Sequence, residues 1–171
     1  VDVDGAFRQV MIHEQDLHVT CFAFPDEEGV MQYYFNRCFG FGGRSSPAIF
    51  GAFAAAIHYI TEQEIRRRAQ DCDFRINHYA DDVLVIGRNL AHTTTAFNIL
   101  LDVLVLIGVP TAIKKTVQPC YALDYLGLHL DTAAGTVSIP ADKRTRMCAD
   151  MTRFINKKQW ELKPTKSIVG K

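Results

Sequence analysis

The chain has 171 residues, of which 48% are hydrophobic and 22% are charged. This composition predicts a globular chain with a substantial core and excludes a disordered one. Lys plus Arg and Asp plus Glu number 19 each, so the net charge gives no indication of a nucleic-acid partner, and any such surface must be a local patch.

The five cysteines are widely spaced and include no C-x-x-C pair. This spacing argues against a zinc site or a disulfide framework and favours a reducing compartment. No apolar run is as long as a membrane span, and no signal peptide precedes the first strand. We therefore expect an intracellular protein, in the cytoplasm or nucleus, without a membrane partner.

The first eleven residues alternate apolar and acidic side chains and then become small and aromatic. The pattern predicts a strand that ends near Asp4 or Gly5 and turns into a short helix. Asp2 would lie at the end of that strand, although taken alone it is better explained as a solvated terminal residue. Because the chain starts with Val and residues 165–171 resemble the beginning of a helix, we expect a fragment of a longer polypeptide.

A polar turn is predicted at residues 13–16, followed by strands at residues 19–24 and 31–36. The loop 25–29 between them contains Pro, acidic residues and Gly, which are typical of turns. We expect these two strands to form an antiparallel hairpin.

A glycine-rich loop precedes Ser46 and Pro47, which suit the N-cap and the first position of a helix. Such a loop can approach a phosphate, but a flexible, well-capped loop explains the same residues. The three arginines at 66–68 fit the solvated end of this helix. Its apolar face is predicted to consist of Phe50, Phe53, Ala54, Ile57, Ile60 and Ile65.

Two adjacent carboxylates, Asp81 and Asp82, stand between an alternating segment, residues 76–79, and an aliphatic run, residues 83–86. The pattern predicts a hairpin with both Asp residues in its turn and a second strand buried on both faces. The turn preference of Asp is by itself a sufficient explanation for the pair. Two like charges beside a dry core repel, so one must be protonated, solvated or neutralised by a cation. If a second acidic strand end faces this turn, a divalent metal site becomes the better explanation.

Residues 91–107 predict an amphipathic helix that ends at Gly108, and a lysine-containing loop follows. Residues 125–130 and 136–139 predict a further hairpin. A last helix is predicted over residues 140–154, because Pro suits a helix start and apolar residues recur at helical spacing.

Five segments form an ordered set of motifs. Residues 2–7 read DVDGAF, residues 42–47 read GGRSSP and residues 79–82 read YADD; a Gly-to-Lys-Thr segment at 108–116 and the tripeptide YLG at 125–127 follow. In this order they resemble motifs A to E of the reverse transcriptase palm. YADD alone is a weak match, whereas the ordered set is specific. The resemblance covers essentially the whole chain.

The subgroup that the chain resembles best is the tyrosine-recombinase (DIRS-like) group of retrotransposons, with gypsy-type elements as the runner-up. The segments that carry this resemblance are residues 6–8, 32–35, 106–110, 115–116 and 126–132.

The resemblance implies a two-metal nucleotidyl transfer, in which ions about 3.5–4 Å apart clamp the attacking and leaving oxygens. Asp2 and Asp81 would bind both Mg²⁺ ions, Asp82 would support the site more weakly, and Val3 would add its backbone carbonyl. Mn²⁺ is a possible substitute. Lys115 aligns with a motif D lysine that protonates the leaving pyrophosphate; as a lone loop lysine it would simply be solvated.

Four residues align with the nucleotide pocket of the family. Phe7 corresponds to the steric gate, an aromatic ring that leaves no room for a ribose 2′-hydroxyl and so favours dNTPs, although an isolated Phe is usually a core residue. Phe41 and Tyr79 are placed beside the incoming nucleotide, and Gly42 permits close approach of the backbone.

The resemblance assigns Tyr125, Leu126 and Gly127 to the primer grip. Basic residues of the predicted thumb helix are placed to follow the template-primer backbone, or else form a solvated face: Lys143, Arg144, Arg146, Lys157 and Lys158. The implied partners are an RNA template, a DNA or RNA primer, dNTPs, and the remaining fingers, thumb and RNase H regions of a parent polyprotein.

We therefore expect an α+β polymerase palm, residues 1–139, with an antiparallel sheet backed by helices, followed by a truncated thumb, residues 140–171, and lacking the fingers. The expected function is RNA-directed DNA polymerisation as part of a retroelement. Two alternatives are a palm polymerase with an RNA product and a catalytically inactive scaffold that binds nucleic acid. Phe7 argues against the first, and the three retained Asp residues argue against the second.

Overall fold

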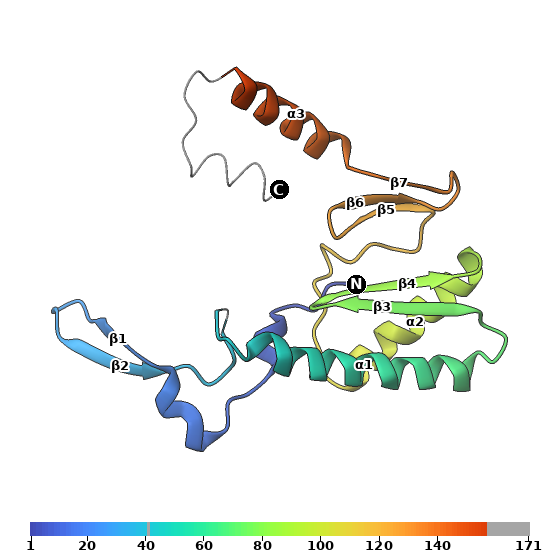
Figure 1. Cartoon of the computed structure of the whole chain (residues 1–171). Coiled ribbons are helices and arrows are strands. Elements are labelled where there is room, and N and C mark those ends of the chain that lie inside the picture. The colour runs from blue at the N-terminus through green and yellow to red at the C-terminus, as the bar shows by residue number, and fades with distance from the viewer. Residues whose placement is uncertain (41, 157–171) are drawn as a thin grey trace. The chain divides into compact units, whose positions relative to one another are not determined.

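The computed structural model describes residues 1–40 and 42–156, and the chain divides into two compact units, Val1–Pro119 and Cys120–Lys171. Every sheet in the described residues is antiparallel, and helices accompany the strands in both units (Figure 1). The expected α+β class, an antiparallel sheet backed by helices, is confirmed. The predicted boundary between a palm and a thumb after residue 139 stays a prediction.

The first unit is built on two helices, α1 (Ser46–Arg68) and α2 (Leu90–Leu106), and a hairpin, β3 (Phe74–Tyr79) and β4 (Asp82–Gly87). Figure 1 shows both helices on the same side of the hairpin. The packing buries two apolar clusters, which supply most of the stabilisation of such a layer. The buried members are Val3, Ala6, Phe50, Ala54, Ile57, Leu100, Leu104 and Val109 in one cluster and Ile65, Phe74, Ala96, Ile99 and Val103 in the other.

The apolar face of α1 differs from the prediction at one turn. Ile60 is 40% exposed, and Thr61 is fully buried in its place. The face follows the helical spacing from Ile57 through Thr61 to Ile65, since residues four apart lie above one another on a helix. Because Thr61 is polar, the pattern of apolar residues in the sequence did not identify this position as buried.

The second strand of the hairpin was predicted to be buried on both faces, and this is wrong. Val83 and Val85 are half-buried and pack against the core, whereas Ile86 is 47% exposed. In the described part of the chain this sheet has two strands, and the helices pack against it from one side. A two-stranded sheet that helices cover from one side leaves its other face without such a cover, and no residue of β4 is fully buried.

The start of the chain pairs with the hairpin and with a later loop. Val3 N–H donates to the Asp81 carbonyl at 3.1 Å, and Asp4 N–H donates to the Pro110 carbonyl at 3.0 Å. Gly5 then takes a left-handed φ of 58° and begins the short 3₁₀ helix η1 (Ala6–Gln9). The predicted short helix is confirmed, whereas the predicted strand is replaced by isolated bridges, Asp2 with Asp82 and Val3 with Thr111.

A separate hairpin consists of β1 (Cys21–Pro25) and β2 (Met31–Phe35), as predicted. The segment before it differs, because the 3₁₀ helix η2 (Glu14–Thr20) replaces both the predicted turn and the start of the strand. The Thr20 hydroxyl is within hydrogen-bond distance of two carbonyls, those of Leu17 at 2.8 Å and Asn36 at 2.9 Å. These contacts hold the end of the 3₁₀ helix, so the strand begins only at Cys21.

Helix α1 begins one residue earlier than predicted. Ser45 is its N-cap, without a side-chain hydrogen bond, and Ser46 is a buried helical residue. Gly43 permits this, because a Cβ there would lie 2.5 Å from Ser46 Oγ.

The arginines at the end of α1 are paired rather than simply solvated. Arg66 contacts Glu62, and both Arg67 and Arg68 contact Glu64, each at 2.8 Å. These i, i+3 and i, i+4 spacings bring opposite charges together on one helix face. Arg68 also contacts Asp102 of α2 at 2.9 Å and so links the two helices.

The second unit contains β5 (Ala122–Tyr125), β6 (Leu128–Asp131), β7 (Thr136–Ser138) and α3 (Ala141–Ile155). The single strand predicted over residues 125–130 is wrong. Leu126 and Gly127 have φ values of 49° and 82° and turn the chain between β5 and β6, since two successive positive φ values close a tight hairpin. The predicted helix after Pro140 is confirmed.

Candidate active site

The backbone places Asp2 directly opposite Asp82, at the first residue of β4. Val3 N–H donates to the Asp81 carbonyl at 3.1 Å, and Val83 N–H donates to the Val1 carbonyl at 2.8 Å. These two bonds flank the Asp2–Asp82 pair, which is therefore a non-hydrogen-bonded antiparallel pair, the kind whose side chains approach most closely. The solvated terminal residue considered for Asp2 is thus wrong, since its side chain is only 14% exposed.

Asp81 lies in the two-residue turn, because the last cross-strand pair of the hairpin is Tyr79 with Asp82. Ala80, the other turn residue, has a left-handed φ of 50°. Asp82 was predicted in the turn but begins the strand. The structure thus brings all three predicted acids to one end of the hairpin.

The electrostatics of this cluster follow from burial and repulsion. Burial raises the pKa of Asp82, and the neighbouring carboxylates Asp81 and Asp2 raise it further. Like charges directly opposite in a sheet are destabilising, so the cluster favours a cation close by.

Lys115 supplies one such charge. Its Nζ lies 3.3 Å from Asp2 Oδ2, although 69% of the lysine side chain is exposed. The loop is attached to the same strand, because Ala112 N–H donates to the Asp2 carbonyl at 2.9 Å and Lys115 N–H donates to the Ala112 carbonyl at 2.9 Å. The motif D loop is therefore fixed beside the first acid.

Phe7 follows the acidic strand on η1 and is half-buried. Its ring centroid lies 5.2 Å from that of Phe50, at an interplanar angle of 48°, a tilted contact typical of aromatic pairs. The phenyl ring therefore packs against the core, as expected for an ordinary core residue. Its role as a steric gate stays a prediction.

The other predicted nucleotide contacts are placed as follows. Gly42 has a φ of 93°, which favours glycine, and a Cβ there would meet no atom within 4 Å. Tyr79 is 65% exposed at the end of β3, and Val3 is buried with its backbone in the Asp81 pairing. Phe41 lies outside the described residues.

A comparison of the sequence with models of protein families gives an independent indication of what the chain is. Residues 1–130 match the model described as "Reverse transcriptase (RNA-dependent DNA polymerase)". The chain belongs to the reverse transcriptase family.

Solved structures with the same fold include three of the foamy viral protease-reverse transcriptase. The one in complex with an RNA/DNA hybrid has a TM-score of 0.69 at 18% identity, and the match covers 99% of this chain and 20% of that one. Two with double-stranded DNA have TM-scores of 0.70 and 0.71 at 19% identity, with 99% of this chain and 25% and 30% of those chains covered. No curated protein sequence matches the chain.

This reverse transcriptase chain thus spans between a fifth and about a third of those solved proteins. The TM-scores show a shared fold. They agree with the α+β palm architecture that the motif order predicted.

Carboxylate oxygens are the ligands that a hard divalent cation prefers, and three Asp residues lie at one end of the hairpin. Within residues 1–40 and 42–156, however, no three His, Cys, Asp or Glu side chains are grouped closely enough to hold a metal ion. The Asp2 side chain is instead paired with Lys115.

The predicted primer-grip residues belong to the second unit of this reverse transcriptase. Tyr125 ends β5 and is half-buried, while Leu126 is 48% exposed in the turn with Gly127. A Cβ at Gly127 would lie 2.9 Å from Lys143 Nζ, so the turn and the start of α3 are in contact. Of the predicted basic helix face, Arg144 and Arg146 are exposed and Lys143 is half-buried, and Lys157 and Lys158 lie outside the described residues.

One contact at the hairpin was missed by sequence reasoning. His58 of α1 and His78 of β3 meet with their Nδ1 atoms 2.9 Å apart. The available signal was the position of His58 on the apolar face of α1, one residue after Ile57, and of His78 two residues after Ile76 on the inward side of β3.

None of the helices in the described parts of this chain has both the length and the apolar character needed to span a bilayer.

Proposed function

We propose that this chain is the catalytic palm of an RNA-directed DNA polymerase, which adds dNTPs to a primer 3′-hydroxyl while copying a retroelement RNA. The observation that carries the proposal is the Asp2–Asp82 pair, held opposite each other beside the Asp81 turn. Like-charged side chains directly opposite are unfavourable in a sheet. A site that keeps them there is suited to bind cations.

In this proposal Asp2 and Asp81 hold two Mg²⁺ ions, or Mn²⁺, with Asp82 in a weaker role and the Val3 carbonyl as a further oxygen ligand. When bound, the ions supply Lewis acidity and neutralise charge on the attacking and leaving oxygens. The chain itself contributes rigid positioning, because the segment that carries Asp2 is paired with the Asp81–Asp82 end of the hairpin on one side and with the loop of residues 110–112 on the other.

Lys115 is proposed as the general acid that protonates the leaving pyrophosphate. A candidate acid must lie within reach of the reacting atoms, and Nζ of Lys115 lies 3.3 Å from an Asp2 oxygen. Its exposure leaves the ammonium free to move toward a bound triphosphate.

The substrate pocket is proposed to consist of Phe7, Phe41, Gly42 and Tyr79. Phe7 would exclude a 2′-hydroxyl and so select dNTPs over rNTPs. Its support is the contact with Phe50, which holds the ring in a defined place next to the acidic strand.

The proposed partners are an RNA template and a DNA or RNA primer, held at Tyr125, Leu126 and Gly127 and along the basic face of α3. Two observations support them: the structural neighbours are complexes with an RNA/DNA hybrid and with double-stranded DNA, and Arg144 and Arg146 are exposed. We further propose a retrotransposon origin of the DIRS-like type, with the gypsy type as the alternative, intracellular location, and fingers, further thumb and RNase H regions in the same polyprotein.

Primer extension tests the proposal in a longer polypeptide that carries this chain together with its fingers. Asp81→Asn should lower Mg²⁺- or Mn²⁺-dependent extension at least about 100-fold, because a metal-binding charge is removed. Asp102→Asn is the matched control, since Asp102 is an exposed acid on α2 that pairs with Arg68, and it should leave extension unchanged. Retained activity in Asp81→Asn would refute the metal assignment.

A second candidate is a catalytically inactive palm that binds nucleic acid. The observation in its favour is that the acids, as they stand in the described residues, do not converge into a three-ligand metal group. It predicts that the longer polypeptide binds an RNA/DNA hybrid but incorporates neither dNTPs nor rNTPs. Incorporation of rNTPs alone would instead indicate a polymerase with an RNA product.

A further inference from the structure

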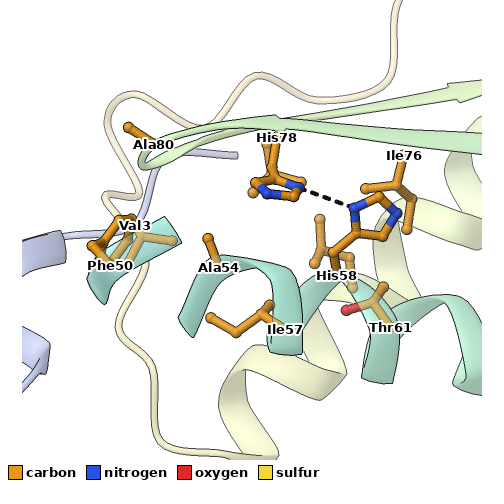
Figure 2. Close-up of a pocket in the computed structure, with 11 residues that line it drawn as sticks. Val3, Phe50, Ala54, Ile57, His58, Thr61, Ile76, His78 and Ala80 are labelled. Carbon is orange, nitrogen blue, oxygen red and sulfur yellow. Dashed lines mark hydrogen bonds between the residues drawn. The ribbon is translucent and has the colours of Figure 1, made fainter. Parts of the chain in front are cut away.

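A small pocket lies between α1 and the β3–β4 hairpin, directly beneath the strand that leads into the acidic turn. Figure 2 shows His58 on α1 and His78 on β3 pointing toward each other across it, above Thr61. The rest of the lining is almost entirely apolar: Val3, Phe50, Ala54, Ile57, Ile76, Ala80, Val83 and Leu100.

The two imidazoles make a direct hydrogen bond. Their Nδ1 atoms lie 2.9 Å apart and the rings meet edge to face at 88°. A neutral imidazole carries one N–H and one lone pair. The contact is therefore satisfied only if one ring has its proton on Nδ1 and the other on Nε2, so the two histidines must adopt opposite tautomers.

The pocket is too small for a ligand. The centre of a water-sized sphere can occupy only about 10 Å³ of it, which is close to the minimum that a single water needs. The feature of this pocket that can have a role is therefore the His58–His78 pair itself.

The pair is well placed to act on the hairpin. His78 lies three residues before Asp81 and opposite Val83 in the sheet register, and Ala80 of the turn lines the same pocket. Ala80 also has a left-handed φ of 50°, a conformation that costs a non-glycine residue energy and needs support from its surroundings.

We propose that His58 is a positioning residue, which holds His78, and through it the turn that carries Asp81 and Asp82, against helix α1 by one shared proton between the two Nδ1 atoms. The catalytic part of this inference rests on the proposed function of those acids. Both histidines are half-buried, and partial removal from water strengthens such a hydrogen bond and makes an unpaired ring nitrogen unfavourable. Burial, and then the nearby His58, also lower the pKa of His78, which keeps that ring neutral at pH 7.

The first test is the tautomer of each ring in the wild-type 171-residue chain, measured from ¹⁵N chemical shifts of the imidazoles. We expect Nδ1–H on one of His58 and His78 and Nε2–H on the other. Two Nε2–H rings, or a transition metal that co-purifies bound to both Nδ1 atoms, would overturn the proposal.

The second test compares two substitutions of the same residue by amide hydrogen exchange. His58→Leu removes the hydrogen bond, whereas His58→Asn keeps a polar group near the position of Nδ1. We expect exchange at residues 79–83 to become about tenfold faster in His58→Leu and to stay within about twofold of wild type in His58→Asn. Amide exchange at Leu100 and Leu104 of α2 distinguishes local opening of the hairpin from destabilisation of the whole fold. If exchange at these two residues accelerates as much as exchange at residues 79–83, the proposal is overturned.

The third test uses primer extension by the longer polypeptide. His58→Leu should lower kcat with little change in KM for the dNTP, and His58→Asn should restore it. If Asp81→Asn is inactive while His58→Leu equals wild type, the positioning role is refuted and the proposed function stands. If Asp81→Asn remains active, the metal assignment fails, and if the wild-type polypeptide extends no primer, the proposed function fails. In either case the tautomer and exchange results still decide whether His58 holds the hairpin.

Discussion

Gly87 shows how a single residue controls the junction between the acidic hairpin and helix α2. It ends β4, and its N–H donates to Thr93 Oγ1 at 3.0 Å. A Cβ at this position would collide with the Thr93 backbone nitrogen and lie 2.8 Å from the His92 carbonyl carbon. Backbone atoms cannot move aside as the end of a side chain can, so the hairpin and the helix start are closely fitted here.

Gly87→Ala should therefore destabilise the chain by about 1–3 kcal/mol, the usual cost of overpacking. Gly51→Ala is the matched control, because Gly51 lies inside α1 and a Cβ there meets nothing within 4 Å; it should stabilise by about 0.5–1 kcal/mol. Urea unfolding followed by circular dichroism measures both. Equal stability of the two variants would contradict the predicted clash.

The pH dependence of stability also has an origin in one residue. Burial, followed by repulsion from His58, lowers the pKa of His78 below its ordinary 6.5. Unfolded His78 therefore binds a proton at pH values where the folded residue stays neutral, and unfolding is favoured there.

The free energy of unfolding should thus fall as the pH is lowered from about 7.5 through 6.5 toward the lower pKa of folded His78. Urea titrations across this range measure the fall, and His78→Phe should make it smaller because the titrating group is gone. An unchanged pH dependence in the variant would assign the effect to another group.

At the scale of elements, helices α1, α2 and α3 lie close to their predicted positions, since apolar residues at helical spacing and clear end signals specify a helix locally. Strands were predicted less well. The 125–130 segment contains a turn because Leu126 and Gly127 both adopt positive φ, and Thr20 closes a 3₁₀ helix through a carbonyl 16 residues away. Such contacts have no periodic signature.

Helix α2 offers a test of how much one buried side chain contributes. Leu104 is fully buried in the core that also contains Val3, whereas Leu106 of the same helix is 77% exposed. Leu104→Ala should cost about 2–5 kcal/mol through lost burial and a cavity, and Leu106→Ala should stay within about 0.5 kcal/mol of wild type. Denaturant midpoints with unchanged m-values would measure the difference. A similar loss in both variants would contradict the assignment of the loss to burial, because Ala is at least as good a helix former as Leu.

For the whole molecule, surface composition decides behaviour in solution. The net charge is zero and the isoelectric point is about 7.1, so little repulsion separates copies near neutral pH. The β1–β2 hairpin exposes a set of aromatic side chains at between 48% and 71%: Phe22, Phe24, Tyr33, Tyr34 and Phe35. The register puts Phe22, Phe24 and Tyr34 on one face of the hairpin and Tyr33 and Phe35 on the other. Exposed apolar surface promotes association.

The 171-residue chain should accordingly associate as its concentration rises near pH 7, and Phe24→Gln with Tyr33→Gln should reduce this. Tyr59→Gln is the control, because Tyr59 is 64% exposed but lies on α1. Sedimentation velocity at several concentrations measures the association. If the control reduces it as much as the hairpin variant does, general surface hydrophobicity is responsible.

The sequence by itself determined the family, the α+β class and the order of helices, because these depend on local periodicity and on residues at characteristic spacing. The roles of the three acids stay a prediction. Only the tertiary structure decided that Asp2 pairs directly with Asp82, that Lys115 reaches Asp2, and that His58 meets His78. Each of these contacts joins residues 20 or more positions apart. Their geometry is set by backbone pairing and helix packing, which no local pattern encodes.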